Sequence, residues 1–271
     1  MNKRPLILIT NDDGITSPGI IALVEAMKDI GNVVVIAPDK PQSGVGHAIT
    51  INATLRLDKT NYHNVKKEYS LSGTPVDCVK MATDKILQRK PDLCVSGINH
   101  GSNISVNVIY SGTMSAAVEG AIDGIPSVGF SLMDYSIGAD FSASGEIAKI
   151  IAKNILLNGL PKDICLNVNI PPLKLSEIKG IKVCRQAKAN WKEEFDERKD
   201  PSGRSYYWLT GEFINMEKEK EDTDVWAVRN NYVSVVPVQF DMTGYSALPA
   251  LEKWKMNDSF AKKTLFYKSK K

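Results

Sequence analysis

The chain has 271 residues, of which 43% are apolar and 24% are charged. This length and composition indicate a soluble globular protein of one large or two modest domains, and they exclude a disordered chain, a collagen-like repeat and a coiled coil. The net charge is +3, but five lysines stand among the last ten residues, so the rest of the chain is slightly acidic. We therefore expect no stable nucleic-acid binding, and we interpret the lysine-rich end as solvated.

The cysteines and the apolar segments bear on the cellular location. The four cysteines are Cys78, Cys94, Cys165 and Cys184. None forms a C-x-x-C pair and each lies in an apolar run, so we expect buried, reduced thiols. The apolar run at 5–9 is too short for a signal peptide, and the charge-free segment 93–118 contains too many Ser, Asn and Gly residues for a membrane span. We expect a cytoplasmic protein that does not contact a membrane.

The first half of the chain predicts alternating strands and helices. Short apolar runs are typical of strands that are buried on both faces, and they occupy 6–9, 33–36, 93–95, 127–130 and 164–170. Helical patterns fall between them, over 18–30, from 74 onward, and over 114–122 and 146–157. Thr74 can cap the second helix, with Pro75 in its first turn and Asp77 near its positive end. This order predicts an α/β fold with a parallel sheet and helices on both faces.

The pattern changes near residues 171–172. Longer β-type runs at 183–197 and 205–213, joined by the turn Asp200-Pro201-Ser202-Gly203, predict an extended hairpin. Its large aromatic residues are Trp191, Tyr206, Tyr207 and Trp208. Such a hairpin rarely stands alone in water, so we expect it to pack on the body or to be exchanged with another subunit.

A late strand at 232–238 and a late helix at 246–254 complete the predicted elements. We expect an α/β catalytic domain at 1–172. We expect residues 173–271 to form a C-terminal region for oligomerisation, whose late strand and helix return to the core.

The clearest candidate site follows the first predicted strand, at Thr10-Asn11-Asp12-Asp13-Gly14. In open parallel sheets, ligands bind beyond the carboxyl ends of the strands. Two adjacent carboxylates repel each other there, and a divalent cation with oxygen ligands relieves that repulsion. The alternative is an Asx turn with both carboxylates in solvent. The position after a fully apolar strand favours the metal, and oxygen donors favour Mg²⁺ or Mn²⁺ over Zn²⁺.

Two polar segments follow the next predicted strands. The segment 41–47 offers Ser43 as a hydroxyl ligand, but it matches neither a dinucleotide fingerprint nor a P-loop. We interpret His47 as a hydrogen-bonded loop residue. In the segment 96–103, Asn99 can give a neutral oxygen to a cation. Both segments can therefore meet the acidic pair at one edge of the sheet.

A fourth segment, Tyr110-Ser111-Gly112-Thr113, precedes the predicted helix at 114–122. A helix N-terminus with hydroxyl groups can bind phosphate, and we expect the missing Cβ of Gly112 to let a phosphate approach the backbone. The alternative is that Ser111 is simply an N-cap. We interpret the small residues of this helix as a sign of close packing on the sheet.

Taken together, these segments resemble the SurE family, the stationary-phase survival proteins, which are metal-dependent nucleotidases. The matching stretches are 9–14, 37–38 with 42–44, 72–78, 96–103 and 110–117. They stand in the order of the family and span most of the first half. Beyond residue 172 the resemblance rests on the hairpin and on Pro237.

The resemblance implies a Rossmann-like α/β fold, one divalent metal ion, and a homodimer or homotetramer built through exchanged C-terminal elements. It implies metal ligands at Asp12, Asp13, Ser43 and Asn99. It implies pocket and phosphate-binding positions at Asn11, Asn103, Ser111, Gly112 and Thr113.

We therefore predict a phosphomonoesterase, of the 5′-nucleotidase or acid-phosphatase type, that acts on nucleoside monophosphates. Asp12 or Asp13 would be catalytic by orienting or deprotonating a water whose pKa the metal lowers. Two alternatives stay open. One is an aspartyl-phosphate phosphatase, although such enzymes separate their two Asp residues by one position. The other is a nucleotide-sensing module without turnover. The preferred base, the choice between 5′ and 3′ esters and the working metal also stay open.

Overall fold

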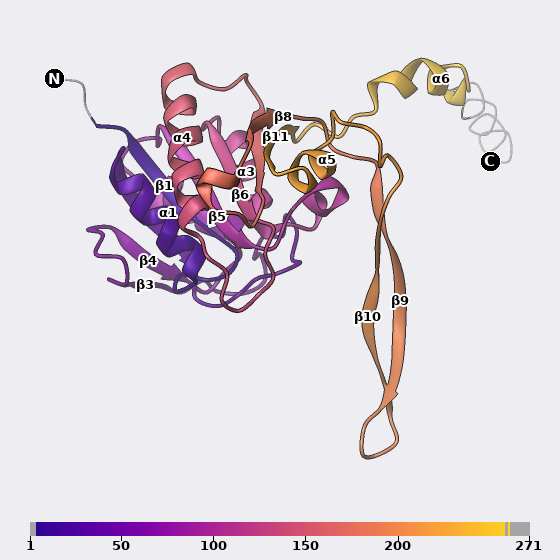
Figure 1. The fold of residues 1–271 in the computed structure, drawn as a ribbon, viewed down its shortest axis with the longest axis horizontal. Coiled ribbons are helices and arrows are strands. Elements are labelled where there is room, and N and C mark those ends of the chain that lie inside the picture. The colour runs from indigo at the N-terminus through magenta and orange to yellow at the C-terminus, as the bar shows by residue number, and fades with distance from the viewer. Residues whose placement is uncertain (1–3, 258–259, 261–271) are drawn as a thin grey trace, which may run out of the picture. The chain divides into compact units, whose positions relative to one another are not determined.

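The computed structural model describes residues 4–257 and residue 260, and it groups the chain into two units that divide after Gln239. The first unit contains a nine-stranded sheet in the order β3-β4-β2-β1-β5-β6-β7-β11-β8 (Figure 1). Its strands are β1 (Leu6–Thr10), β2 (Asn32–Pro38), β3 (Leu57–Lys59), β4 (Glu68–Leu71), β5 (Leu93–His100), β6 (Ser127–Leu132), β7 (Ile164–Ile170), β8 (Gly180–Val183) and β11 (Tyr232–Gln239). Within this sheet the pairs β3–β4 and β7–β11 are antiparallel and the other pairs are parallel, so the predicted, mostly parallel sheet is confirmed.

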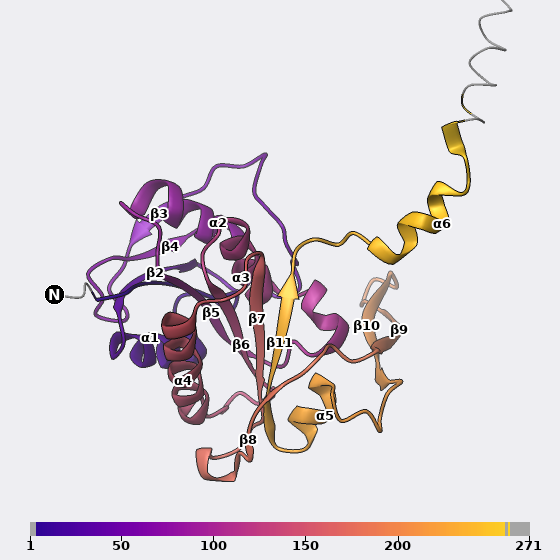
Figure 2. The same ribbon diagram turned by 90° about the horizontal axis from the view of Figure 1, so that it is seen from above.

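Helices cover both faces of this sheet (Figure 2). They are α1 (Pro18–Lys28), α2 (Pro75–Met81), α3 (Gly112–Ile122), α4 (Ser142–Asn158) and α5 (Asp224–Arg229), with short helical turns at Ala82–Ile86, Ser105–Ile109 and Leu175–Glu177. Helices α1 and α4 enclose one core together with Ile7 and Ile9, whereas α2 and α3 share the other core with Leu8. Alternate residues of β1 thus point to opposite cores, which explains its continuous apolar sequence.

Local signals in the sequence account for the ends and the spacing of two helices. Thr74 Oγ1 accepts the Asp77 N–H at 3.1 Å and Asp77 Oδ2 accepts the Thr74 N–H at 2.9 Å, so the predicted cap of α2 is confirmed as a reciprocal capping box. A Cβ added to Gly120 in α3 would lie 2.3 Å from Ser127 Oγ. The glycine therefore lets α3 approach the sheet closely, as predicted.

The cysteines and the helices agree with the sequence-based expectations. All four cysteines are buried and free, and burial raises the pKa of the Cys94 thiol to about 12. Within the described ranges, no helix is both long enough and apolar enough to cross a membrane. The charge-free segment 93–118 is divided among β5, a 3₁₀ turn and α3.

The predicted hairpin forms a separate antiparallel sheet of β9 (Ala189–Lys199) and β10 (Ser205–Asn215), which extends from the rest of its unit as a long ribbon (Figure 1). The predicted turn is confirmed, because the Asp200 carbonyl accepts the Gly203 N–H at 2.9 Å. The prediction of one continuous run over 183–197 is wrong. Strand β8 ends in the main sheet beside β11, and β9 starts only at Ala189.

The first unit runs to Gln239, because β11 inserts between β7 and β8. In the second unit, the predicted helix at 246–254 is a 3₁₀ turn (Tyr245–Ala247) followed by the short helix α6 (Leu248–Glu252). The five lysines of the chain end lie outside the described residues.

Candidate functional site

A cavity of about 740 Å³ lies beyond the carboxyl ends of β1 and β5. Five of the residues that the sequence indicated line it: Asp12, Ser43, Asn99, Asn103 and Ser111. Its walls contain the carboxylates of Asp12 and Glu193 but no Lys or Arg side chain among the described residues. We call this cavity the acidic pocket. It occupies the edge of the sheet at which open α/β proteins bind ligands.

Asp12 is the most buried carboxylate of the acidic pocket, with 4% of its surface exposed. Thr113 Oγ1 donates to Asp12 Oδ1 at 2.5 Å. Burial raises the pKa of Asp12 to about 6, and the charge of Asp13 adds to this effect, whereas the Thr113 hydrogen bond opposes it. The Asp12 carbonyl also accepts the Gln42 N–H at 2.7 Å, which ties the loop that bears Ser43 to the end of β1.

Asp13 lies beside the acidic pocket rather than in its wall. Its Oδ2 accepts the His100 N–H at 3.0 Å, and burial raises the pKa of Asp13 as well. It lines a neighbouring cavity of about 320 Å³ together with His100 and Phe141. Because His100 lines both cavities, the two adjacent carboxylates face neighbouring spaces at the end of β5.

Asn99 belongs to β5 itself, which corrects the prediction that its polar segment follows the strand. The strand continues to His100, and its pairing with β6 shifts register between Ser96 and Asn99. Gly97 makes this irregularity possible, because its φ is +123° and an added Cβ would lie 2.4 Å from the Phe130 carbonyl oxygen. Asn99 Nδ2 donates to the Gly101 carbonyl at 2.7 Å, which leaves Asn99 Oδ1 available as a ligand.

Asn103 is held by a buried amide network that the sequence did not indicate. Its N–H donates to Asn169 Oδ1 at 2.7 Å, and its Nδ2 donates to Ser131 Oγ at 2.9 Å. Its carbonyl accepts from Asn167 Nδ2 at 2.8 Å, and Asn169 Nδ2 bonds to Asn167 Oδ1 at 3.0 Å. The signal in the sequence was the pair of asparagines within the otherwise apolar β7, since buried amides need such partners.

The start of α3 supplies Ser111 and Gly112. Ser111 Oγ accepts the Met114 N–H at 3.0 Å, so the N-cap reading is confirmed, and the same residue lines the acidic pocket. The expectation for Gly112 needs correction. A Cβ at this position would meet Asp12 Cβ at 2.7 Å and Asp12 Oδ2 at 2.9 Å, so the space beside Gly112 is filled by Asp12.

Asn11 and His47 have internal hydrogen bonds. Asn11 Nδ2 donates to the Gly14 carbonyl at 2.9 Å and to Ser17 Oγ at 2.8 Å, which shapes the loop after β1. His47 Nε2 bonds to the buried Glu119 at 2.9 Å, which confirms its interpretation as a hydrogen-bonded loop residue. Neither side chain lines the acidic pocket.

Asp224 connects the segment just before the hairpin to the turn Ser105–Ile109, and no pattern in the sequence indicated this role. Its buried carboxylate accepts the N–H groups of Ser105 at 2.8 Å, Ala187 at 3.0 Å and Val225 at 2.8 Å. Burial raises the pKa of Asp224, and these hydrogen bonds oppose that rise. The carboxylate thereby fixes the turn Ser105–Ile109 and the start of the hairpin relative to each other.

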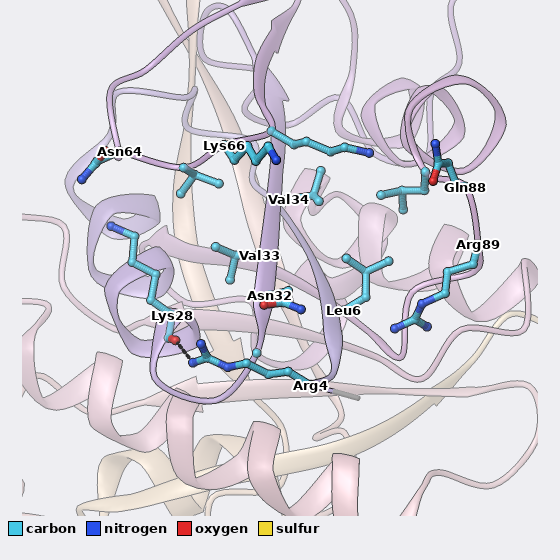
Figure 3. A pocket seen from close by; sticks show the side chains of 14 residues that line it. Arg4, Leu6, Lys28, Asn32, Val33, Val34, Asn64, Lys66, Gln88 and Arg89 are labelled. Carbon is cyan, nitrogen blue, oxygen red and sulfur yellow. Dashed lines mark hydrogen bonds between the residues drawn. The ribbon is translucent and has the colours of Figure 1, made fainter. Parts of the chain in front are cut away.

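A second large cavity, of about 810 Å³, lies at the amino ends of β1 and β2 (Figure 3). Five cationic side chains line it: Arg4, Lys28, Lys66, Lys67 and Arg89. Arg4 donates to the Lys28 carbonyl at the end of α1, and Lys67 Nζ donates to the Ile86 carbonyl at 3.2 Å. Cations at helix C-termini offset the negative end of the helix, so we assign these two side chains a structural role.

The residues of the acidic pocket suit a divalent cation. Asp12 is a buried carboxylate with no Lys or Arg beside it in the described pocket wall, and Ser43 and Asn99 add neutral oxygens of the kind that Mg²⁺ and Mn²⁺ bind. The described part of the chain contains no group of three or more His, Cys, Asp or Glu side chains placed to hold a metal. The expected ligand set differs from such a group, because it combines two carboxylates with a hydroxyl and an amide.

The fold and the acidic pocket define a Rossmann-like α/β protein with a cavity beyond the carboxyl edge of its sheet, which is where open α/β folds bind ligands. The family model described as survival protein SurE matches residues 7–193. The chain belongs to the SurE family, which confirms the resemblance seen in the sequence.

Curated relatives and a solved structure agree with this assignment. The chain is 64% identical over 260 residues to a protein of Christiangramia forsetii named 5′-nucleotidase SurE, with 94% of this chain and 99% of that protein covered. It is 62% identical over 256 residues to a protein of Flavobacterium psychrophilum with the same name, at coverages of 94% and 99%. The crystal structure of the SurE protein from Aquifex aeolicus superimposes with a TM-score of 0.82 at 44% identity, and covers 93% of this chain and 100% of its own.

Proposed function

We propose that this chain is a 5′-nucleotidase, a phosphomonoesterase that hydrolyses nucleoside monophosphates to nucleoside and phosphate. The observation that carries the proposal is the buried Asp12 carboxylate in a pocket of amides and hydroxyls that contains no Lys or Arg in its described wall. The names of the relatives support the substrate class. Whether 3′-nucleotides are also substrates is an outcome of the assay below.

The proposed metal ligands are Asp12, Asp13, Ser43 and Asn99. When bound there, a divalent ion supplies positive charge to the phosphate oxygens and lowers the pKa of a water molecule. Three further residues would hold these ligands in position: Thr113, Gly112 and Asn11. Thr113 donates to Asp12, Gly112 leaves room for the Asp12 side chain, and Asn11 shapes the loop that carries both carboxylates.

Ser111 and Asn103 are the proposed phosphate ligands. Ser111 Oγ accepts the Met114 N–H, which leaves the Ser111 hydroxyl proton free for a phosphate oxygen. The positive end of α3 adds to this attraction. Asp12 or Asp13 would orient the attacking water and take its proton as the new O–P bond forms. The ester O–P bond breaks, and the leaving nucleoside oxygen takes up a proton from solvent.

A phosphate-release assay tests this function. Purified protein, stripped with EDTA, is supplied with Mg²⁺ or Mn²⁺ and with 5′- or 3′-nucleoside monophosphates. We expect phosphate release only with metal. Nucleotide binding without release would instead support the sensing module. A hydroxylamine-sensitive phosphoprotein would support the aspartyl-phosphate mechanism.

We further propose that the chain forms a homodimer or homotetramer through its C-terminal region, with residues 1–172 supplying the predicted catalytic groups. The hairpin carries Tyr206, Tyr207 and Trp208 with between 42% and 58% of their surfaces exposed. Exposure of this much aromatic surface to water is unfavourable, and contact with another subunit would remove it. The free, buried cysteines support a location in the reducing cytoplasm.

A further inference from the structure

The hairpin forms one wall of the acidic pocket, and its chemistry differs from that of the other walls. Trp191 and Glu193 of β9 and Leu209, Thr210 and Gly211 of β10 line the cavity that also contains Asp12. The proposed metal and phosphate ligands are small and polar. The hairpin wall instead presents an indole ring and an apolar side chain.

Trp191 is fixed in this wall while part of its ring stays open. Its Nε1–H donates to Asn107 Oδ1 at 2.8 Å, and its ring meets the Phe213 ring edge-to-face with centroids 5.6 Å apart. Nevertheless 39% of the residue is exposed, and it lines the acidic pocket. A large aromatic ring held at two points is already ordered before a ligand arrives, so stacking on it costs little entropy.

The size of the acidic pocket calls for more than a phosphate group. Its volume of about 740 Å³ lies within the range of sites that enclose a whole small ligand. The carboxylate, hydroxyl and amide groups that bind metal and phosphate account for only the part of the cavity around Asp12. The hairpin wall, with Trp191 and Leu209, is the candidate place for the remainder of a phosphate ester.

We propose that Trp191 is the stacking platform for the nucleobase of the substrate, and so a specificity-determining residue of this chain. The inference rests on the proposed nucleotidase function. Every base has a π-face, so stacking on the indole accepts all bases and separates nucleotides from base-free phosphate esters. The Glu193 carboxylate, beside Trp191 in the wall, is an acceptor for donors on the nucleoside.

The test compares two substrates in three variants. Trp191→Ala removes the ring, Trp191→Phe keeps a smaller one, and Trp208→Ala is the matched control, because Trp208 stands on the same hairpin but not in the pocket wall. The substrates are adenosine 5′-monophosphate and ribose 5-phosphate, which lacks the base. We expect Trp191→Ala to raise KM for the nucleotide about tenfold with kcat nearly unchanged, and to leave KM for ribose 5-phosphate unaltered. Trp191→Phe should restore most of the affinity.

Other outcomes would overturn the assignment. An equal loss on both substrates, no loss on either, or the same loss in Trp208→Ala would show that Trp191 does not stack on the base. Calorimetric titration with adenosine, which has no phosphate, supplies a readout that is independent of turnover. If wild-type protein hydrolyses neither ester, the nucleotidase proposal fails. The base subsite would still be supported if adenosine binds to the wild type and to Trp208→Ala but not to Trp191→Ala.

Discussion

Gly112 lies directly against the side chain of Asp12, so close that a Cβ on the glycine would be 2.7 Å from Asp12 Cβ. The start of α3 and the acidic pair after β1 are therefore one packed unit. A substitution at Gly112 therefore disturbs Asp12 as well. It cannot separate a phosphate-binding role of the start of α3 from a metal-binding role of the acidic pair.

The first prediction is that Gly112→Ala lowers both Mn²⁺ affinity and turnover, because the added methyl group displaces the Asp12 carboxylate. A displacement of about 1 Å in a reacting group can reduce turnover about 100-fold. Calorimetric titration with Mn²⁺ and kinetics on one preparation measure the two effects. Gly138→Ala is the control, since a Cβ there meets nothing within 4 Å. Unchanged Mn²⁺ affinity in Gly112→Ala would show that the carboxylate does not bind the metal.

The second prediction concerns the acidic pair. Asp12→Asn should abolish metal-dependent phosphate release and leave the fold intact, because Asn keeps the shape of the side chain and its bond to Thr113. Without metal the variant should be at least as stable as wild type in urea, since a buried charge next to Asp13 has been removed. Wild-type rates in this variant would exclude Asp12 as ligand or base.

The third prediction concerns the hairpin tip. Residues 195–209 can be replaced by Asn-Gly, which joins the paired positions Glu194 and Thr210 and keeps Trp191 in place. Light scattering should show the shortened protein shifted toward the monomer relative to the full chain, because the exposed aromatic residues of the hairpin have been removed. A full-length protein that is monomeric at micromolar concentration would contradict the proposed assembly.

The fourth prediction concerns the buried carboxylate of Asp224. Asp224→Ala leaves the N–H groups of Ser105 and Ala187 without an acceptor, which should lower the free energy of unfolding by roughly 2–5 kcal/mol. Asp222→Ala is the control, because Asp222 is exposed and its carboxylate bonds, within the described part of the chain, to the partly exposed Arg185. Urea denaturation of both variants measures the difference, and equal stabilities would show that the buried contact contributes little.

The fifth prediction concerns pH. Arg185 holds the pKa of Glu217 down at about 2 and also lowers the pKa of Asp222. A carboxyl whose pKa is lower in the folded state stabilises the protein above its unfolded value of 4.5, and this contribution disappears as the pH falls toward 2. Arg185→Gln should therefore be less stable than wild type at pH 7, and the two should converge below pH 4.5. A constant gap across this range would rule out linkage through these carboxylates. Arg56→Gln, which removes a charge without such partners in the described ranges, should show no trend.

The central strands of the α/β unit were predictable because burial on both faces leaves a continuous apolar run, as in β1 and β2. The end of β5 was not predictable, because Ser96 and Gly97 are typical of a strand end. The backbone nevertheless continues to pair with β6 beyond them. Helix α5 was missed because it is six residues long and its first carboxylate is engaged in contacts from distant parts of the chain.

The candidate site was predictable to the extent that parallel topology brings strand ends together. That rule placed Asp12, Ser43 and Asn99 at one edge, and all three line one cavity. It could not place Trp191 or Asp224, because their positions depend on hydrogen bonds to Asn107 and Ser105, which no local pattern reveals.

The bond between Asp224 and Ser105 joins two parts of the chain that are synthesised at different times. The ribosome releases the acidic pair early, the hairpin later and α5 later still. A nascent chain that ends before α5 has both carboxylates but lacks the acceptor that fixes the start of the hairpin. The acidic pair thus precedes the hairpin wall of the pocket in the chain, and a chain that ends before α5 lacks the carboxylate that accepts the Ser105 N–H.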